Sequence, residues 1–470
     1  MTQPASSHGF VRGLGLWDAT AVVAGSMIGS GIFIVSADIA RQVGSPGWLL
    51  VVWGVSAVMT IIGALSYGEL AAMMPQAGGQ YVYLREAYGP LAGFLFGWTL
   101  FLVIQAGTIA AVSVAFAKFT AVILPTFDAV FHVGPLPLSA QQCIAIVVVT
   151  VLTAANCNGL RTGRLVQNVF TATKIGALLV LVAFGLLAGR NPVALQANLR
   201  NFWGTDPVSL ALLPLIGAAM VGALFSSDAW NNITFAAAEV RDPARTVPLS
   251  LMIGTGAVST LYIAANLVYL AALPLVGEAG AATAIGRGIQ FAASDRVATA
   301  AIGVTLGPTG AVVMALAIMI STFGCVNGLI LAGARVYYAM AQDGLFFPVA
   351  GLLNTRRVPA AALVLQGIWA ALLTLSGTYG DLLDYVIFAA LLFYVLTVGA
   401  VFVLRRTRPH VPRPYRAFGY PLVPAAYIVL AALIMIDLLI VKPRYSWPGL
   451  LIVASGVPVF YWWRRRAPRL

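Results

Sequence analysis

Residues 27–33, Met-Ile-Gly-Ser-Gly-Ile-Phe, interrupt the first apolar segment of the chain and decide how the rest is interpreted. The surrounding run from Ala19 to Ala37 has no charge and is long enough to cross a bilayer. Its centre nevertheless holds Gly29 and Gly31 around Ser30, which are poor helix formers. Backbone groups freed at membrane depth must be buried in protein or face a wet cavity, where they can hold a ligand. The alternative is that these small residues only let helices pack closely.

The composition of the 470-residue chain is that of a membrane protein. Hydrophobic residues make up 60% of the chain and charged residues 9%, whereas soluble proteins carry about 25% charged residues. Residues 1–15 contain no apolar core of the length that a cleavable signal needs, so we expect the first hydrophobic segment to stay as a span. Membrane topology explains the net charge of +12 better than nucleic-acid binding does. The three cysteines lack metal-type spacing, so we expect no metal, no cofactor and no disulfide framework.

Runs that are long enough to span a bilayer recur along the chain. Two further segments, around Lys174 and Asp228, qualify despite one internal charge each. Together with the first helix, the total is twelve expected spans. The charge-free runs are residues 42–68, 87–117, 129–160, 246–277, 297–334, 358–380, 385–404, 417–436 and 445–463.

Basic residues favour a topology with both termini in the cytoplasm. In this orientation eighteen lysines and arginines fall on the cytoplasmic side and seven outside, while Lys118 and Lys174 lie within spans. The cluster Arg-Arg-Thr-Arg at residues 405–408 is the strongest single indication of this orientation. We also expect a separate short helix at residues 81–88, after a Pro and a Gly pair, and short helices over the outer mouth at residues 273–295.

A second interruption lies in the sixth span, where residues 225–232 read Phe-Ser-Ser-Asp-Ala-Trp-Asn-Asn. An unpaired acid within a span costs roughly 3 kcal/mol on insertion scales, so Asp228 needs wet or hydrogen-bonded surroundings. It either lines a substrate cavity or is a structural acid that accepts from neighbouring amides. Five spans separate the starts of the two interrupted helices, so these helices cross the membrane in opposite directions. An inverted repeat of spans 1–5 on spans 6–10 produces this relation.

The ends of two such broken helices suit a ligand that carries both signs of charge. Amides freed at the N-terminus of a half-helix attract a carboxylate. Carbonyls freed at the C-terminus of a half-helix attract an ammonium group. A free amino acid carries both groups, so it is a ligand that fits the two expected breaks.

Several motifs in fixed order resemble the amino acid, polyamine and organocation transporter superfamily, and within it the L-amino acid transporter family. The similarity runs from about Leu14 to the last helices. The resemblance implies an all-α polytopic membrane protein with a LeuT-type 5+5 inverted repeat, discontinuous helices 1 and 6, and alternating access. The motifs are residues 27–33, Tyr-Gly-Glu-Leu at 67–70 with Pro75, Gly78, Gly79 and Tyr81, residues 225–230 followed by Glu239 and Pro243, Ser-Thr-Phe-Gly-Cys-Val-Asn-Gly at 321–328, and Arg413-Pro414-Tyr415 with Gly419-Tyr420-Pro421.

On this fold we expect four parts in the chain. They are a cytosolic tail at residues 1–14, a first repeat at 15–190, a second repeat at 191–408, and two further helices with a cytosolic end at 409–470. The resemblance also implies where the substrate binds. Its carboxylate would meet the backbone amides of Gly29, Ser30 and Gly31, and its amino group would meet carbonyls at Met27 or Ile28 and around Phe225, Ser226 and Asp228.

Two single residues carry roles in the related transporters. Phe225 matches an aromatic side chain that closes over bound substrate from outside, although ordinary core packing is the alternative. Lys174 matches a lysine whose ammonium group replaces a sodium ion between the first break and span 8, near the hydroxyl of Ser321 or Thr322. Retention of Lys174 for folding alone is the other interpretation. The first interpretation predicts transport that does not depend on sodium.

We expect exchange or facilitated transport of neutral L-amino acids in a bacterial plasma membrane. The outer segment at residues 125–139 has no cysteine, so no disulfide-linked ancillary subunit is expected. The second hypothesis is proton-coupled uptake of cationic amino acids or polyamines, with Asp228 paired to the substrate cation. An acid at this place occurs in relatives of both kinds, and Ala229 follows it where relatives often have glycine, so selectivity stays open.

Three other classes of membrane protein fit the sequence less well. A membrane enzyme would need catalytic side chains together, whereas His8, His132 and His410 are scattered over a tail and two loops. A channel needs a continuous pore with several weak sites rather than one occluded site. A nutrient sensor would add a signalling domain to the spans. We therefore expect a transporter whose partners are an amino acid and the lipid bilayer.

Overall fold

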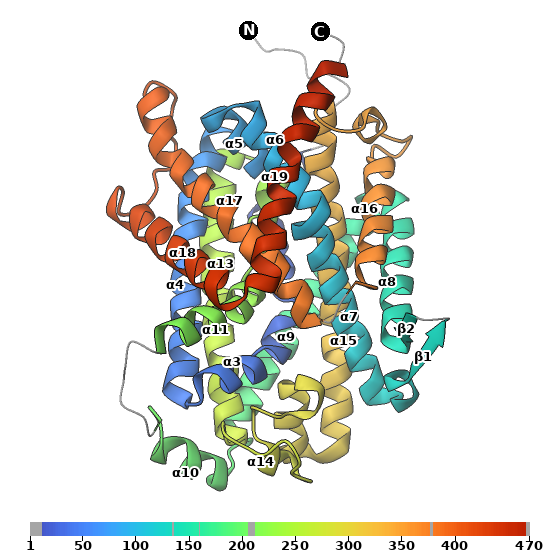
Figure 1. The fold of residues 1–470 in the computed structure, drawn as a ribbon, viewed down its shortest axis with the longest axis vertical. Helices are drawn as coiled ribbons and strands as arrows, with labels where there is room; N and C mark the ends of the chain where they lie inside the picture. The colour runs from blue at the N-terminus through green and yellow to red at the C-terminus, as the bar shows by residue number, and fades with distance from the viewer. Residues whose placement is uncertain (1–11, 134–135, 159, 205–211, 377–378, 467–470) are drawn as a thin grey trace.

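The computed structural model describes residues 12–133, 136–158, 160–204, 212–376 and 379–466. Figure 1 shows a mainly helical molecule with both termini at one end of its long axis. Within the described ranges, nine helices are long and apolar enough to cross a membrane. Two shorter apolar helices, Leu212–Ser226 and Ala360–Leu373, accompany them. The chain is thus a multi-pass membrane protein, as its composition predicts.

The helices and strands are numbered in chain order. The first half contains α1 (Leu16–Met27), α2 (Gly31–Ile34), α3 (Ser36–Val43), α4 (Pro46–Met73), α5 (Gln80–Tyr88), α6 (Pro90–Thr99), a π-helical turn (Leu100–Ile104), α7 (Gln105–Ile123), β1 (Val130–Val133), β2 (Leu136–Ser139), α8 (Ala140–Cys157), α9 (Leu160–Leu187) and α10 (Pro192–Arg200). The second half contains α11 (Leu212–Ser226), α12 (Asn232–Phe235), α13 (Pro243–Ala272), α14 (Ala284–Arg287), α15 (Val297–Gln342), α16 (Ala360–Leu373), α17 (Tyr379–Thr407), α18 (Leu422–Val441) and α19 (Pro443–Arg466).

Local sequence explains where several helices begin and end. Proline occupies the first position of α4, where a missing N–H costs nothing. Ser139 caps α8, because its Oγ accepts from the Gln142 amide at 3.1 Å while the Gln142 side chain accepts from the Ser139 amide at 2.9 Å. Gly44 ends α3 with φ of 65°, a left-handed conformation that glycine adopts without strain.

The predicted all-α architecture is found in the membrane-spanning helices, and one short connecting segment departs from it. β1 and β2 form a two-stranded antiparallel hairpin immediately before α8. The charge-free run at residues 129–160 therefore becomes helical only at Ala140. The run at 297–334 is also divided, since Gly307 has φ of 65° and Pro308 follows it within α15. Absence of charge does not distinguish an apolar outer segment from the span that comes after it.

Two expectations about short helices are confirmed. α5 follows the Pro and Gly pair as a separate helix of nine residues. Between residues 273 and 295 the chain forms α14 and a 3-10 turn, Ala293–Asp295, and Figure 1 shows α14 at the end of the molecule away from the termini. The interior around α1 is formed by α9, α13 and α15, and α11 packs against α3 and α4. This packing places the ends of α1 and α11 inside the protein.

Candidate functional site

The first break lies between α1 and α2. α1 ends at Met27, and Ile28 leaves the helical region with φ of −74° and ψ of 86°. The Gly29 amide donates to the carbonyl of Met27 at 2.8 Å instead of reaching a carbonyl one helical turn back. All residues from Met27 to Gly31 are buried. The helix is therefore interrupted at the predicted place, and its freed groups are enclosed by protein.

Lys174 on α9 holds the carbonyl end of this break. Its Nζ donates to the carbonyl of Gly25 at 2.7 Å and to that of Ile28 at 3.0 Å, and the residue is 0% exposed. The hydroxyl of Ser321 on α15 reaches the same Ile28 carbonyl at 3.3 Å. Thr322 instead donates to carbonyls of its own helix. A fixed cation thus lies against freed carbonyls, in the kind of oxygen-lined place that suits a small hard cation.

The second break lies between α11 and α12. α11 ends at Ser226 and α12 begins at Asn232. Between them Ala229 adopts φ of 62°, in the left-handed region. A side chain with a Cβ costs about 1–2 kcal/mol there. This conformation means that Ala229 holds the break at some cost.

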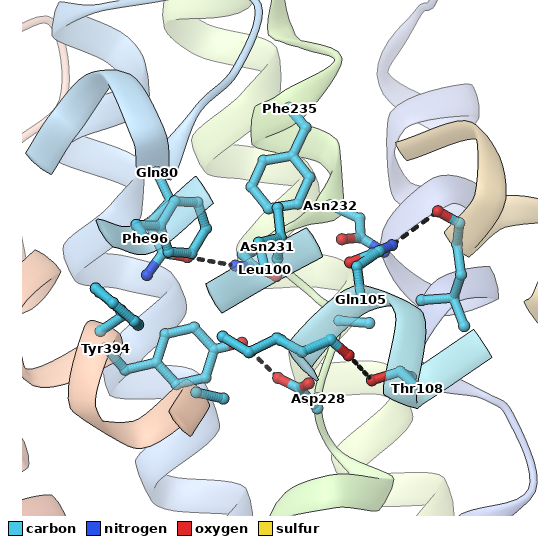
Figure 2. Close-up of a pocket in the computed structure, with 15 residues that line it drawn as sticks. Gln80, Phe96, Leu100, Gln105, Thr108, Asp228, Asn231, Asn232, Phe235 and Tyr394 are labelled. Atoms are coloured by element: carbon cyan, nitrogen blue, oxygen red, sulfur yellow. Dashed lines mark hydrogen bonds between the residues drawn. The ribbon is translucent and has the colours of Figure 1, made fainter. Parts of the chain in front are cut away.

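The acid of the second break faces a small inner cavity, drawn in Figure 2. Tyr394 on α17 donates its hydroxyl to the carboxylate of Asp228, and Asn231 donates to the side-chain oxygen of Gln80 at 2.9 Å. The cavity has a volume of about 10 Å³, which is room for one water molecule. The Nδ2 group of Asn232, on the same wall, is buried and has no partner among the described residues. This polar wall could therefore bind a water molecule beside Asp228.

The two breaks touch each other. A Cβ built on Gly31 would lie 2.1 Å from the Oγ of Ser226, so only glycine fits at this contact. The hydroxyl of Tyr262 on α13 lies between the breaks and shares its one proton between the carbonyl of Met27 at 2.9 Å and that of Ser226 at 3.1 Å. One tyrosine thus ties both breaks together in this conformation.

A larger cavity approaches the first break from the end of the molecule away from the termini. Its volume is about 780 Å³, and Tyr379 on α17 forms part of its lining. The Tyr379 hydroxyl lies 3.0 Å from the Oγ of Ser30, and its ring meets Phe225 edge to face with centroids 6.1 Å apart. Tyr379 therefore separates this cavity from Ser30, with buried Phe225 packed against it.

Ion pairs join segments at the end of the molecule that carries the termini. Glu69 lies 2.6 Å from Arg405 and 3.3 Å from Arg413, and Glu239 lies 2.5 Å from Arg335. These pairs connect α4 with α17, and α15 with the segment after α12. Ion pairs thus link the helices at the end that carries the termini, and the larger cavity lies toward the other end.

A further pair at this end involves Glu86 on α5, which bonds to Arg408 at 2.6 Å and to Arg85 at 3.0 Å. Burial raises the pKa of Glu86, and the hydrogen bonds and charges of Arg408 and Arg85 lower it by more, so the net shift is downward. Glu86 is therefore ionised at neutral pH, and its pairs persist there.

The structure thus gathers the predicted substrate residues of the two breaks into one buried region, and Lys174 and Ser321 meet at the first break. Of the predicted substrate residues, Asp228 alone lines the inner cavity. No sequence signal marked Tyr262, Tyr379 or Tyr394, because tyrosine is an ordinary residue of membrane helices. Within the described ranges, no group of three or more His, Cys, Asp or Glu side chains is placed to hold a metal ion.

Comparisons with known proteins agree with this geometry. A family model described as amino acid permease matches residues 14–461. The b(0,+)-type amino acid transporter 1 of Homo sapiens is 29% identical over 98% of this chain and 89% of its own length. The large neutral amino acids transporter small subunit 2 of Homo sapiens is 30% identical over 95% of this chain and 79% of its own length. The similarity therefore extends over nearly the whole array of helices, both breaks included.

Proposed function

Because the chain belongs to the amino acid permease family, we propose that it is a secondary transporter that moves L-amino acids across a membrane by alternating access. The supporting observation is the contact of two broken helices at Gly31 and Ser226, deep in the protein. One end of the molecule is hollow and the other is held by ion pairs, as expected for one of the two alternating states. The protein is a transporter and not an enzyme.

The proposed substrate site is the space that opens when the two breaks separate. The substrate carboxylate binds the amides of Gly29, Ser30 and Gly31, which precede a helical course that continues from α2 through Val35 into α3. The aligned peptide dipoles of this helical segment favour a negative charge at its N-terminus. Binding requires movement, because Gly31 is now in van der Waals contact with Ser226.

The proposed site for the amino group is the carbonyl side of the breaks, at Met27 or Ile28 and around Phe225, Ser226 and Asp228. In the present conformation the Met27 carbonyl accepts from Gly29 and Tyr262, and the Ser226 carbonyl accepts from Tyr262. Since a carbonyl has two lone pairs, an ammonium group at Met27 must displace the tyrosine hydroxyl. Substrate binding and release of Tyr262 are thus coupled in this proposal.

Transport is proposed to be independent of sodium, by exchange or facilitated movement. The ammonium group of Lys174 already bonds the Gly25 and Ile28 carbonyls, which a bound sodium ion would otherwise have to satisfy. Ser321 shares the Ile28 carbonyl and completes the site from α15, with Thr322 as its neighbour on the same helix. A permanent cation removes the need to bind an ion in each cycle.

The proposed topology has twelve spans in a 5+5 inverted repeat, residues 15–190 and 191–408, followed by the helices of residues 409–470. The opposite directions expected for the two interrupted helices, whose starts are five expected spans apart, support it, and the distribution of arginine supports cytoplasmic termini. We place the protein in a bacterial plasma membrane without a disulfide-linked ancillary subunit. The name of one relative describes that protein as a small subunit, but the outer segment at residues 125–139 offers no cysteine here.

Neutral L-amino acids are the first choice of substrate. The alternative, proton-coupled uptake of cationic amino acids or polyamines, is favoured by one observation, the buried carboxylate of Asp228 beside a polar cavity. In the present conformation Tyr394 donates a hydrogen bond to this acid but brings no positive charge. A cationic substrate side chain would supply the missing positive charge.

Uptake of radiolabelled amino acids into proteoliposomes tests the function and the choice of substrate. The wild-type protein is expected to take up neutral amino acids, faster when unlabelled substrate is inside. Asp228→Asn keeps an oxygen that accepts from Tyr394, so it should fold and should leave leucine uptake within about twofold of wild type. If arginine uptake were abolished while leucine uptake survived, the cationic alternative would be correct. Equal loss for all substrates would identify Asp228 as a structural acid. The matched control is Tyr394→Phe, which removes the hydrogen bond to Asp228 but leaves the acid in place.

A further inference from the structure

The 780 Å³ cavity at the hollow end is large enough for a small-molecule site. In the proposed orientation it opens to the outside, and we call it the outer vestibule. Its lining comes from α3, α7, α11, α17, α19 and the hairpin of β1 and β2. In Figure 1 α3 and the hairpin lie in the half of the molecule opposite the termini, and α7 runs into that half. Any substrate that comes from outside passes through this space before it reaches the first break.

Most charges of the outer vestibule are already paired. Arg41 lies 2.7 Å from Asp295 and 3.5 Å from Asp38. Lys442 lies 2.8 Å from Asp384. The hydroxyl of Tyr445 donates to Asp381 at 2.5 Å. The two other cations of the lining, Arg41 and Lys442, are therefore already engaged by acids and exert little pull on a substrate carboxylate.

Lys118 on α7 differs from these groups. Among the described residues it forms no ion pair, although it lines the same vestibule as the paired charges. Its ammonium group lies over the ring of Tyr379, 5.6 Å from the centroid. Tyr379 in turn contacts Ser30 and Phe225. An unpaired cation therefore lies on the aromatic side chain that separates the vestibule from the first break.

We propose that Lys118 binds the carboxylate of an incoming amino acid in the outer vestibule, and so forms a loading site before the central one. A half-buried ammonium group without an anionic partner attracts a carboxylate more strongly than one in bulk water, because the local dielectric is lower. The carboxylates of Asp38 and Asp384 line the same space, and either would accept from the substrate's ammonium group by exchanging its present partner, Arg41 or Lys442. The loading site delivers the substrate with its carboxylate next to Tyr379 and Ser30.

This inference rests on the proposed transport of amino acids. It assigns substrate binding to Lys118, which lies outside the central site that the two breaks form. Lys118 does not touch the central site directly, so its effect belongs to the approach from outside. It should therefore change the apparent affinity for external substrate and leave the affinity for internal substrate alone. Loss of the cation that binds the substrate carboxylate should also weaken the salt dependence of external binding, because salt screens that local charge pair.

The test compares Lys118→Gln, Lys118→Arg and Lys442→Gln in cells that express the protein, with KM measured separately for inward and outward transport. Lys118→Gln is expected to raise the KM for external leucine about tenfold, with the internal KM and the maximal rate unchanged. Lys118→Arg should restore the external KM. Lys442→Gln removes the same charge from the same vestibule and should shift the external KM less than about twofold, because that cation is already paired.

A second measurement does not depend on the folding of any variant. The external KM of the wild-type protein should rise with ionic strength, and the internal KM should not. An external KM that is insensitive both to salt and to Lys118→Gln would overturn the loading site, as would equal shifts on both sides of the membrane. If the wild-type protein moved no amino acid, the proposed function would fail first and the loading site with it.

Discussion

The two breaks solve the same physical problem in different ways. Both leave backbone groups without helical partners inside the protein, where each unsatisfied group would cost several kcal/mol in a lipid environment. At the first break other helices supply donors to the freed carbonyls, above all the charged Nζ of Lys174. At the second break the chain supplies an acid of its own, Asp228, and a strained residue, Ala229.

This difference indicates which break keeps the same partners with every substrate and which can interact differently with different substrates. The first break is held by a buried cation that no substrate needs to provide. The second break holds a buried acid that accepts from the neutral hydroxyl of Tyr394 and has no cation paired with it in the described structure. We infer that the first break sets the common requirement for an amino acid, whereas the second adjusts which side chains are accepted. Three substitutions can break or sharpen this contrast.

Lys174→Met should have the largest effect. It removes the only charged donor to the carbonyls of Gly25 and Ile28 in the described structure and leaves both buried groups with lost hydrogen bonds, each worth about 1–3 kcal/mol. Uptake of every substrate should fall by about tenfold or more, without a change in the ratio of substrates. The control is Thr173→Val, next to it on the exposed side of α9, which should transport normally. Selective loss of one substrate would contradict the proposed division of roles.

Gly31→Ala should be intermediate, because it inserts a methyl group at the contact between the breaks. The new Cβ would lie 2.1 Å from Ser226 Oγ and 2.8 Å from its Cα, so the backbones must move apart at a cost of about 1–3 kcal/mol. Thermal stability and uptake should both decrease. Gly54→Ala on α4 has nothing within 4 Å of the new Cβ and should leave both unchanged. Equal effects of the two substitutions would mean that the breaks do not depend on close contact.

Ala229→Gly should have the smallest effect and the opposite sign. Glycine adopts φ of 62° without the clash of a Cβ, so the substitution should raise stability by up to about 1 kcal/mol. The measurement is the midpoint of thermal unfolding of the purified protein in detergent. A marked loss of stability would show that the Ala229 methyl group packs productively and that its conformation carries no strain.

Both breaks could be predicted from the sequence alone, because a Gly-Ser-Gly run and a buried acid each disfavour a continuous helix in an otherwise apolar span. Family resemblance also placed Lys174 near the first break. The hairpin before α8 was missed, since the apolar residues 129–139 contain no Lys, Arg, Asp or Glu that would exclude them from a span. Tyr262 and Tyr379 were missed too, because their importance comes only from the hydroxyl positions that packing creates. Contacts between distant segments leave no local pattern in the sequence.

Replacement of sodium by potassium during uptake tests most directly whether Lys174 takes the place of an ion at the first break. Wild-type protein in proteoliposomes preloaded with unlabelled leucine should take up labelled leucine at the same initial rate in both salts. An absolute requirement for sodium would contradict this role of Lys174, because a bound ion would then be needed beside it.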